Sequence, residues 1–118
     1  MNLSFSKEDQ EFQQEVRNFI EQNYPSEIKE KQDQGIPLSK EDTIKWHKIL
    51  NDKGWLAVNW PEELGGTGWT ITQKHIFQNE LAAANTPTLM PFGVNMCGPV
   101  IYTFGSDEQK EFHLPKIL

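Results

Sequence analysis

The chain has 118 residues, of which 36% are hydrophobic, and a formal net charge of −6. This length suffices for one domain with one hydrophobic core. The acidic balance disfavours nucleic acid as a partner, because a phosphate backbone is bound by clustered positive charge and no basic stripe is present. No apolar run approaches the ~20 residues of a membrane span. The first residues, Met1–Lys7, lack the features of a signal peptide.

The first part of the chain carries the signals of three capped helices. Ser6 is a good N-cap for an amphipathic helix that continues to Tyr24 and ends before Pro25. A short, charged and exposed helix is expected over residues 26–34. Ser39 is the next N-cap, and acidic residues follow it in the first turn, where the helix dipole favours them.

The helix that begins at Ser39 has a clear stop signal. Gly54 suits the left-handed residue that closes a helix, and Leu50 and Trp55 occupy the two positions whose side chains touch in a Schellman motif. We therefore expect this helix to end just before Gly54.

The stretch Trp60–Gly68 has the sequence W-P-E-E-L-G-G-T-G and cannot be a regular element. Pro61 lacks an N–H donor and disfavours a helical conformation at Trp60. Three glycines within four residues permit positive φ angles and close backbone approach. The sequence predicts a tightly packed loop between two helices.

Two capping boxes are expected in the second half of the chain. Thr70 with Gln73, and Ser106 with Gln109, have the spacing at which each side chain satisfies a backbone donor at a helix start. The helix after Thr70 should break near residues 85–88, and the helix after Ser106 should be closed by Pro115.

The segment Met90–Phe104 is the most apolar of the chain, and its glycines and Pro99 predict either a kinked helix or a helix that starts partway through the segment. Phe92, Asn95 and Met96 lie three and four residues apart, on one helical face. Two interpretations stay open: a buried central helix, or a wall of an apolar ligand pocket with an exposed patch where other protein would pack.

The remaining reactive side chains indicate no chemistry. Cys97 cannot form an internal disulfide, which fits a reducing compartment and an expected cytoplasmic location. With no base beside it in sequence, Cys97 is expected to be a small buried hydrophobe. His47, His75 and His113 have no metal-ligand spacing, so no metal site is expected.

No strand-like alternation occurs in the sequence. Five or six helices with short connections predict an all-α fold, a five- to six-helix bundle that forms a single helical domain over residues 1–118.

Four motifs together resemble the N-terminal helical domain of the acyl-CoA dehydrogenase family. The first is W-P-x-E-x-G-G-x-G at Trp60–Gly68, and the second is Glu80-Leu81-Ala82 on the following helix. Gly98-Pro99 leading to Phe104-Gly105, and then G-S-D-E-Q-K followed by Leu114-Pro115, complete the series in the family's order and spacing.

The resemblance implies an FAD-dependent oxidoreductase, an acyl-CoA dehydrogenase that introduces a Cα–Cβ double bond into an acyl-CoA thioester. In that family a middle β-barrel and a C-terminal helical domain follow, and these hold the flavin and the catalytic glutamate. This chain ends at Leu118. We therefore expect no catalytic and no cofactor-binding residue in it, and no activity or FAD binding by the fragment alone.

The resemblance also assigns a substrate wall and partners. Phe92, Asn95 and Met96 are the expected pocket residues. The intact enzyme would use acyl-CoA as substrate and electron-transfer flavoprotein as electron acceptor, and would form a homo- or hetero-oligomer. An alternative hypothesis is a non-catalytic helical interaction module that reuses this fold.

Overall fold

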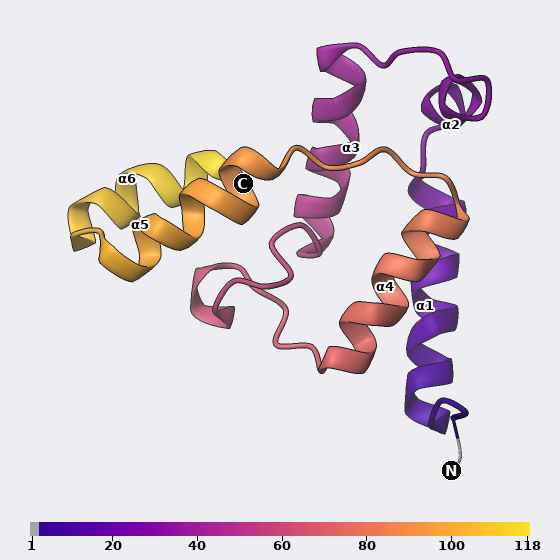
Figure 1. The fold of residues 1–118 in the computed structure, drawn as a ribbon, viewed down its shortest axis with the longest axis horizontal. Helices are drawn as coiled ribbons and strands as arrows, with labels where there is room; N and C mark the ends of the chain where they lie inside the picture. The colour runs from indigo at the N-terminus through magenta and orange to yellow at the C-terminus, as the bar shows by residue number, and fades with distance from the viewer. Residues whose placement is uncertain (1–2) are drawn as a thin grey trace. The chain divides into compact units, whose positions relative to one another are not determined.

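The computed structural model describes residues 3–118, and these residues form helices and loops without a strand (Figure 1). This confirms the all-α prediction. The elements in chain order are α1 (Lys7–Asn23), α2 (Ser26–Asp33), α3 (Lys40–Lys53), the 3₁₀-helix η1 (Glu62–Leu64), α4 (Ile71–Ala83), the π-helix η2 (Phe92–Cys97), α5 (Gly98–Phe104) and α6 (Asp107–Ile117).

The chain divides into two compact units. Unit 1 comprises the described residues up to Asp42 together with Trp69–Pro87, and unit 2 comprises Thr43–Gly68 with Thr88–Leu118. Helix α3 starts in unit 1 and continues in unit 2. The sequence predicted a single helical domain over residues 1–118, and that stays a prediction.

Unit 1 is built on the apolar face of α1. The Ser6 side chain accepts a hydrogen bond from the Asp9 backbone N–H at 3.1 Å, as expected of an N-cap. Phe12, Val16 and Ile20 are buried along one side of the helix. The helix ends at Asn23, so Pro25 lies just beyond its cap.

Helices α1 and α4 lie side by side and run in the same direction (Figure 1). One contact joins the starts of the two segments and another joins their ends. Phe12 packs edge-on against Trp69 with ring centroids 5.0 Å apart, and the Tyr24 hydroxyl donates to the Asn85 carbonyl at 2.9 Å. Trp69 also meets Phe77 at 5.1 Å. Aromatic pairs of this geometry add to the burial of apolar area.

In unit 2, α3 ends in the predicted Schellman motif. Gly54 has φ +80°, its N–H donates to the Asn51 carbonyl at 2.8 Å, and the Trp55 N–H donates to the Leu50 carbonyl at 2.9 Å. Trp46, Leu50 and Trp55 are buried. The positive φ at Gly54 thus turns the chain into the loop that follows.

The stretch Trp60–Gly68 contains the short 3₁₀-helix η1, where the sequence predicted no regular element. Its glycines serve close approach as well as turning. A side chain at Gly66 would overlap the Trp60 carbonyl oxygen, and one at Gly68 would overlap the Glu62 carboxylate. The Thr67 hydroxyl donates to the Val58 carbonyl at 3.1 Å. The G-G-x-G pattern is therefore occupied by the loop's own backbone and side chains.

Both predicted capping boxes are present. The Gln73 N–H donates to the Thr70 hydroxyl at 3.1 Å, and the Thr70 N–H donates to the Gln73 side-chain carbonyl at 3.0 Å. At α6, the Gln109 N–H donates to the Ser106 hydroxyl at 3.2 Å, and the Ser106 N–H donates to the Gln109 side chain at 2.9 Å. Gly105 separates α5 from α6, which lie side by side (Figure 1).

The prediction that Pro115 closes the last helix is wrong. Helix α6 runs to Ile117 with Pro115 inside it. Proline removes one intrahelical bond, to the carbonyl of Glu111 four residues earlier, and that residue is exposed. Water can satisfy this carbonyl, and the Leu118 N–H still reaches the Leu114 carbonyl at 3.4 Å.

Replacing the α6 cap tests the local stability argument. We expect Ser106→Ala to lower the free energy of unfolding by about 1 kcal/mol, because the Gln109 N–H loses its acceptor. Chemical denaturation of the 118-residue chain measures this, with the exposed α5 variant Thr103→Ala as control. An unchanged denaturation midpoint in Ser106→Ala would show that the cap does not stabilise the chain.

Replacing Gly66 tests close packing in the loop. We expect Gly66→Ala to destabilise the chain more than Gly54→Ala does. At Gly54 a side chain meets open space and pays only the positive-φ cost of ~1 kcal/mol, whereas at Gly66 it must displace the Trp60 carbonyl. Thermal unfolding of the two variants side by side decides the point, and equal losses would contradict it.

Candidate functional site

The segment that the sequence singled out forms a π-helix followed by an α-helix. In η2 the N–H of Gly98 donates to the carbonyl of Gly93, five residues earlier. The sequence predicted a kink or a helix start within this segment; the structure has a π-helix from Phe92 that continues directly into α5. π-helical turns of this kind are frequent at functional sites.

The π-helical pairing of Gly98 and the proline at position 99 together leave one carbonyl without a main-chain donor. The carbonyl of Val94 would take its donor from Gly98 in an α-helix or from Pro99 in a π-helix. Gly98 already donates to Gly93, and Pro99 has no N–H. The Val94 carbonyl therefore needs a donor from elsewhere in the fold.

Trp60 supplies that donor. Its indole Nε1 donates to the Val94 carbonyl at 2.7 Å, and the side chain is only 4% exposed. A side chain at Gly98 would overlap the indole ring, so the glycine is what lets the ring lie against the backbone. Tyr102 packs edge-on to Trp60 with ring centroids 5.8 Å apart.

The outer side of this segment carries exposed apolar side chains. Each of the following is more than half exposed: Met90, Phe92, Met96, Val100 and Phe104. We call this set the apolar face. Asn95 is exposed beside it, whereas Val94 is buried. The interpretation of the segment as a buried central helix is thus wrong for this chain, because only Val94 and Gly98 of η2 and α5 are buried.

Phe92, Asn95 and Met96 therefore share η2 and are all exposed. Among the described residues, the apolar face is the largest run of exposed, large apolar side chains in one stretch of chain. Exposed apolar patches of this kind mark surfaces that contact a ligand or another protein surface.

The prediction that Cys97 is buried is also wrong, because its side chain is exposed. The burial of Val94 and Gly98, on the inner side of the segment, leaves Cys97 on the solvent side. No group of three or more His, Cys, Asp or Glu side chains within residues 3–118 is arranged to hold a metal ion. Within those residues no helix is both long enough and apolar enough to cross a membrane.

His47 is the histidine with a perturbed environment. Burial lowers the pKa of its imidazole, and a hydrogen bond with the Ile117 backbone acts in the opposite direction. Its side chain lines an open cavity of about 310 Å³, together with residues of α3, Met90 and the last residues of the chain. The hydrogen bond with the Ile117 backbone ties α3 to the end of α6.

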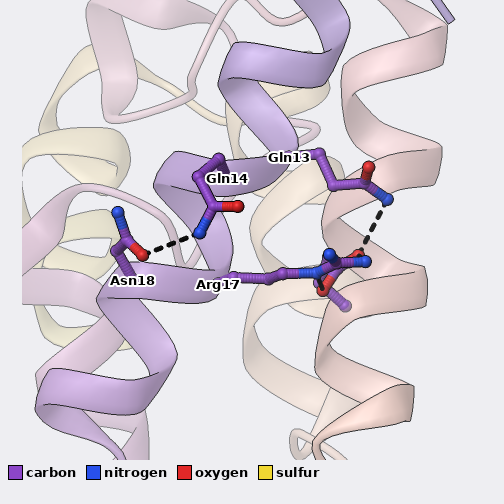
Figure 2. A network of polar contacts seen from close by, with 5 residues as sticks. Gln13, Gln14, Arg17 and Asn18 are labelled. Atoms are coloured by element: carbon purple, nitrogen blue, oxygen red, sulfur yellow. Dashed lines mark hydrogen bonds and ion pairs between the residues drawn. The ribbon is translucent and has the colours of Figure 1, made fainter.

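A buried carboxylate in unit 1 is the centre of a network of polar contacts (Figure 2). Glu80 on α4 is 7% exposed and accepts from Arg17 Nε at 2.8 Å, from Arg17 Nη2 at 3.0 Å and from Gln13 Nε2 at 2.9 Å. The bidentate bond raises the pKa of Arg17. Gln14 and Asn18, also drawn in Figure 2, bond each other at 2.9 Å on the exposed side of α1.

This cluster is suited to joining helices. Both oxygens of Glu80 are occupied by donors from α1, so neither is available to remove a proton from a substrate. Arg17 and Glu80 line an open cavity of about 210 Å³, whose other lining residues belong to α1, to α4 and to the C-cap of α4. The buried charge is compensated within the fold, as burial of a carboxylate requires.

The sequence contained signals for both features, although pattern analysis missed them. An acid at position 80 continues the helical spacing of buried Ile76 and Phe77, which marks a buried carboxylate needing a partner. Pro99 within an apolar helix marks a carbonyl without a donor. Neither signal identifies its partner, which comes from a distant segment.

Comparison with known proteins places the chain. Residues 6–118 match the family described as acyl-CoA dehydrogenase, N-terminal domain. Acyl-CoA dehydrogenase FadE26 of Mycobacterium tuberculosis is 32% identical over 99% of this chain and 30% of its own length. Acyl-CoA dehydrogenase IpdE1 of Mycolicibacterium smegmatis is 32% identical over 92% of this chain and 29% of its own length.

A solved structure agrees with these relatives. A chain in the ChsE4–ChsE5 complex from Mycobacterium tuberculosis superimposes with a TM-score of 0.74 and 29% identity, covering 99% of this chain and 29% of that one. The present chain thus spans about 30% of the length of the relatives that it matches. It belongs to the acyl-CoA dehydrogenase family, as an N-terminal helical domain.

Proposed function

We propose that this chain is the N-terminal domain of a flavin-dependent acyl-CoA dehydrogenase, in which the apolar face forms one wall of the acyl pocket. The observation that carries the proposal is the exposure of Phe92 and Met96 on a π-helix whose backbone is anchored by Trp60. A fatty acyl chain offers only dispersion and hydrophobic contacts, so a firmly held apolar surface is the complementary partner.

Within this proposal Phe92 and Met96 contact the acyl chain. Phenyl and thioether groups are apolar and polarizable, and methionine adapts its shape to a flexible ligand. Asn95, exposed between them, offers the amide donor and acceptor of the wall. Removal of the acyl chain from water stabilises the bound state in proportion to the apolar area covered.

The glycine loop of this chain does not fit a flavin pyrophosphate. The glycine loop offers no open cradle for a pyrophosphate, because the Trp60 carbonyl lies against Gly66 and the Glu62 carboxylate lies against Gly68. A carboxylate at that position would repel a phosphate. We therefore propose that FAD, which in this family accepts a hydride from the substrate, contacts other parts of the intact enzyme, as does the catalytic base.

The proposal extends to partners and place. The relative of known structure was crystallised as a complex of two named proteins, ChsE4 and ChsE5. We propose that the intact enzyme likewise forms an oligomer, from identical or different subunits, and passes electrons to an electron-transfer flavoprotein. One exposed cysteine, Cys97, is compatible with a reducing, cytoplasmic setting.

A substitution at Met96 tests the pocket wall. In the intact enzyme we expect Met96→Trp to shift the ratio of kcat/KM values for long and short acyl-CoA substrates toward the short ones by on the order of tenfold, because added volume removes space for methylene groups. Steady-state kinetics with both substrates measures the ratio. The control is Ile71→Trp, which enlarges an exposed apolar residue of unit 1.

An unmoved ratio in Met96→Trp would assign the apolar face to another role. The leading alternative is a surface for protein–protein contact, as in a non-catalytic interaction module. In that case the same variant would weaken association without changing acyl preference.

The assignment of the flavin elsewhere has its own test. We expect the purified 118-residue chain neither to bind FAD with micromolar affinity nor to reduce a dye in the presence of acyl-CoA. Flavin fluorescence during titration measures binding, with an intact acyl-CoA dehydrogenase as positive control. Tight binding by the isolated chain would show that its own residues form a flavin site.

A further inference from the structure

We propose that Trp60 is a positioning residue of the acyl wall: it sets the hydrogen-bond register of η2 and thereby the direction in which Phe92 and Met96 face. It acts from the buried side, without contacting the substrate. The link to acyl selectivity rests on the proposed function of the apolar face. The link between Trp60 and the register of η2 is independent of that function.

The Val94 carbonyl depends on a hydrogen-bond donor from outside η2. In η2 the Gly98 N–H is bonded to Gly93, and Pro99 provides none, so the Val94 carbonyl depends on the Trp60 indole at 2.7 Å. An unsatisfied buried carbonyl is costly. Without the indole, the nearest available donor is the Gly98 N–H itself, which lies four residues along the chain, at α-helical spacing.

The Trp60 indole also lies against the point where η2 becomes α5. The indole occupies the space where a side chain at Gly98 would lie, at the point where η2 becomes α5. At the other end, the backbone carbonyl of Trp60 is packed against Gly66. Trp60 thus contacts the glycine loop at its backbone and the π-helix at its side chain.

The hydrogen-bond pairing of Gly98 sets the direction in which Phe92 and Met96 face. A change of pairing from Gly98–Gly93 to Gly98–Val94 removes one residue from the turn. One residue corresponds to roughly 100° of rotation in an α-helix, so Phe92 and Met96 would turn by about that angle relative to α5. A rotation of this size would exchange exposed for buried positions on the wall. The hydrogen bond from Trp60 prevents it.

The register can be observed directly in the 118-residue chain. Through-hydrogen-bond scalar coupling in NMR identifies the carbonyl to which the Gly98 N–H donates. We expect coupling to the Gly93 carbonyl in the wild type and to the Val94 carbonyl in Trp60→Phe. The control is Trp55→Phe, which removes another buried indole of unit 2 and should leave the Gly93 coupling in place.

A second variant separates the hydrogen bond from packing. Replacement of Trp60 by benzothienylalanine keeps the shape of the indole but substitutes sulfur for the N–H group, so the fold keeps its volume. We expect it to switch the Gly98 pairing as Trp60→Phe does. Retention of the Gly93 coupling in the benzothienylalanine variant would overturn the proposal, because packing alone would then hold the register.

Kinetics of the intact enzyme tests the link to selectivity. We expect Trp60→Phe to change the ratio of kcat/KM for long and short acyl-CoA substrates several-fold, and Trp55→Phe to leave it near the wild-type value. If Met96→Trp shifts the ratio and Trp60→Phe does not, Trp60 has no positioning role. If neither variant shifts it while the Gly98 pairing still switches, the pocket wall is refuted and the register role of Trp60 stands.

Discussion

The hydrogen bond from the Trp60 indole to the Val94 carbonyl joins two distant segments of unit 2. It satisfies a carbonyl that Pro99 leaves without a donor, and it does so from a residue of the glycine loop. The loop needs Gly66 to bring its backbone against Trp60, and the π-helix needs Gly98 to admit the indole ring. The two glycines thus leave room for a large aromatic ring, and the indole N–H of that ring satisfies the Val94 carbonyl.

Unit 1 has a comparable polar tie between its two long helices. Glu80 of α4 is buried and receives three hydrogen bonds from Arg17 and Gln13 of α1. A buried charge is tolerated when each oxygen has donors, and it penalises any arrangement of the helices that separates the partners. In both units, a polar group that must be satisfied fixes which distant segments meet, while apolar packing supplies most of the stabilisation.

These two ties leave the molecule with a firm scaffold and few reactive groups. The carboxylate with the best geometry is fully engaged, and the glycine loop is filled by its own atoms. The exposed apolar side chains of the apolar face lie mainly on η2 and α5. A domain of this kind suits the shaping of a binding pocket, with the chemistry supplied elsewhere in the acyl-CoA dehydrogenase that we propose.

The sequence alone determined where three of the helices begin and where α3 ends, because those signals are local: Ser6, Thr70 and Ser106 each bond within one turn, and Gly54 closes α3 through residues beside it. It also placed the family, through motifs of fixed spacing. Tertiary structure decided the rest. The donor for the Val94 carbonyl comes from Trp60, 34 residues earlier in the chain, and Cys97 and Phe92 are exposed within an apolar segment. Burial and long-range hydrogen bonding arise from the path of the whole chain, which a periodic pattern of neighbours does not encode.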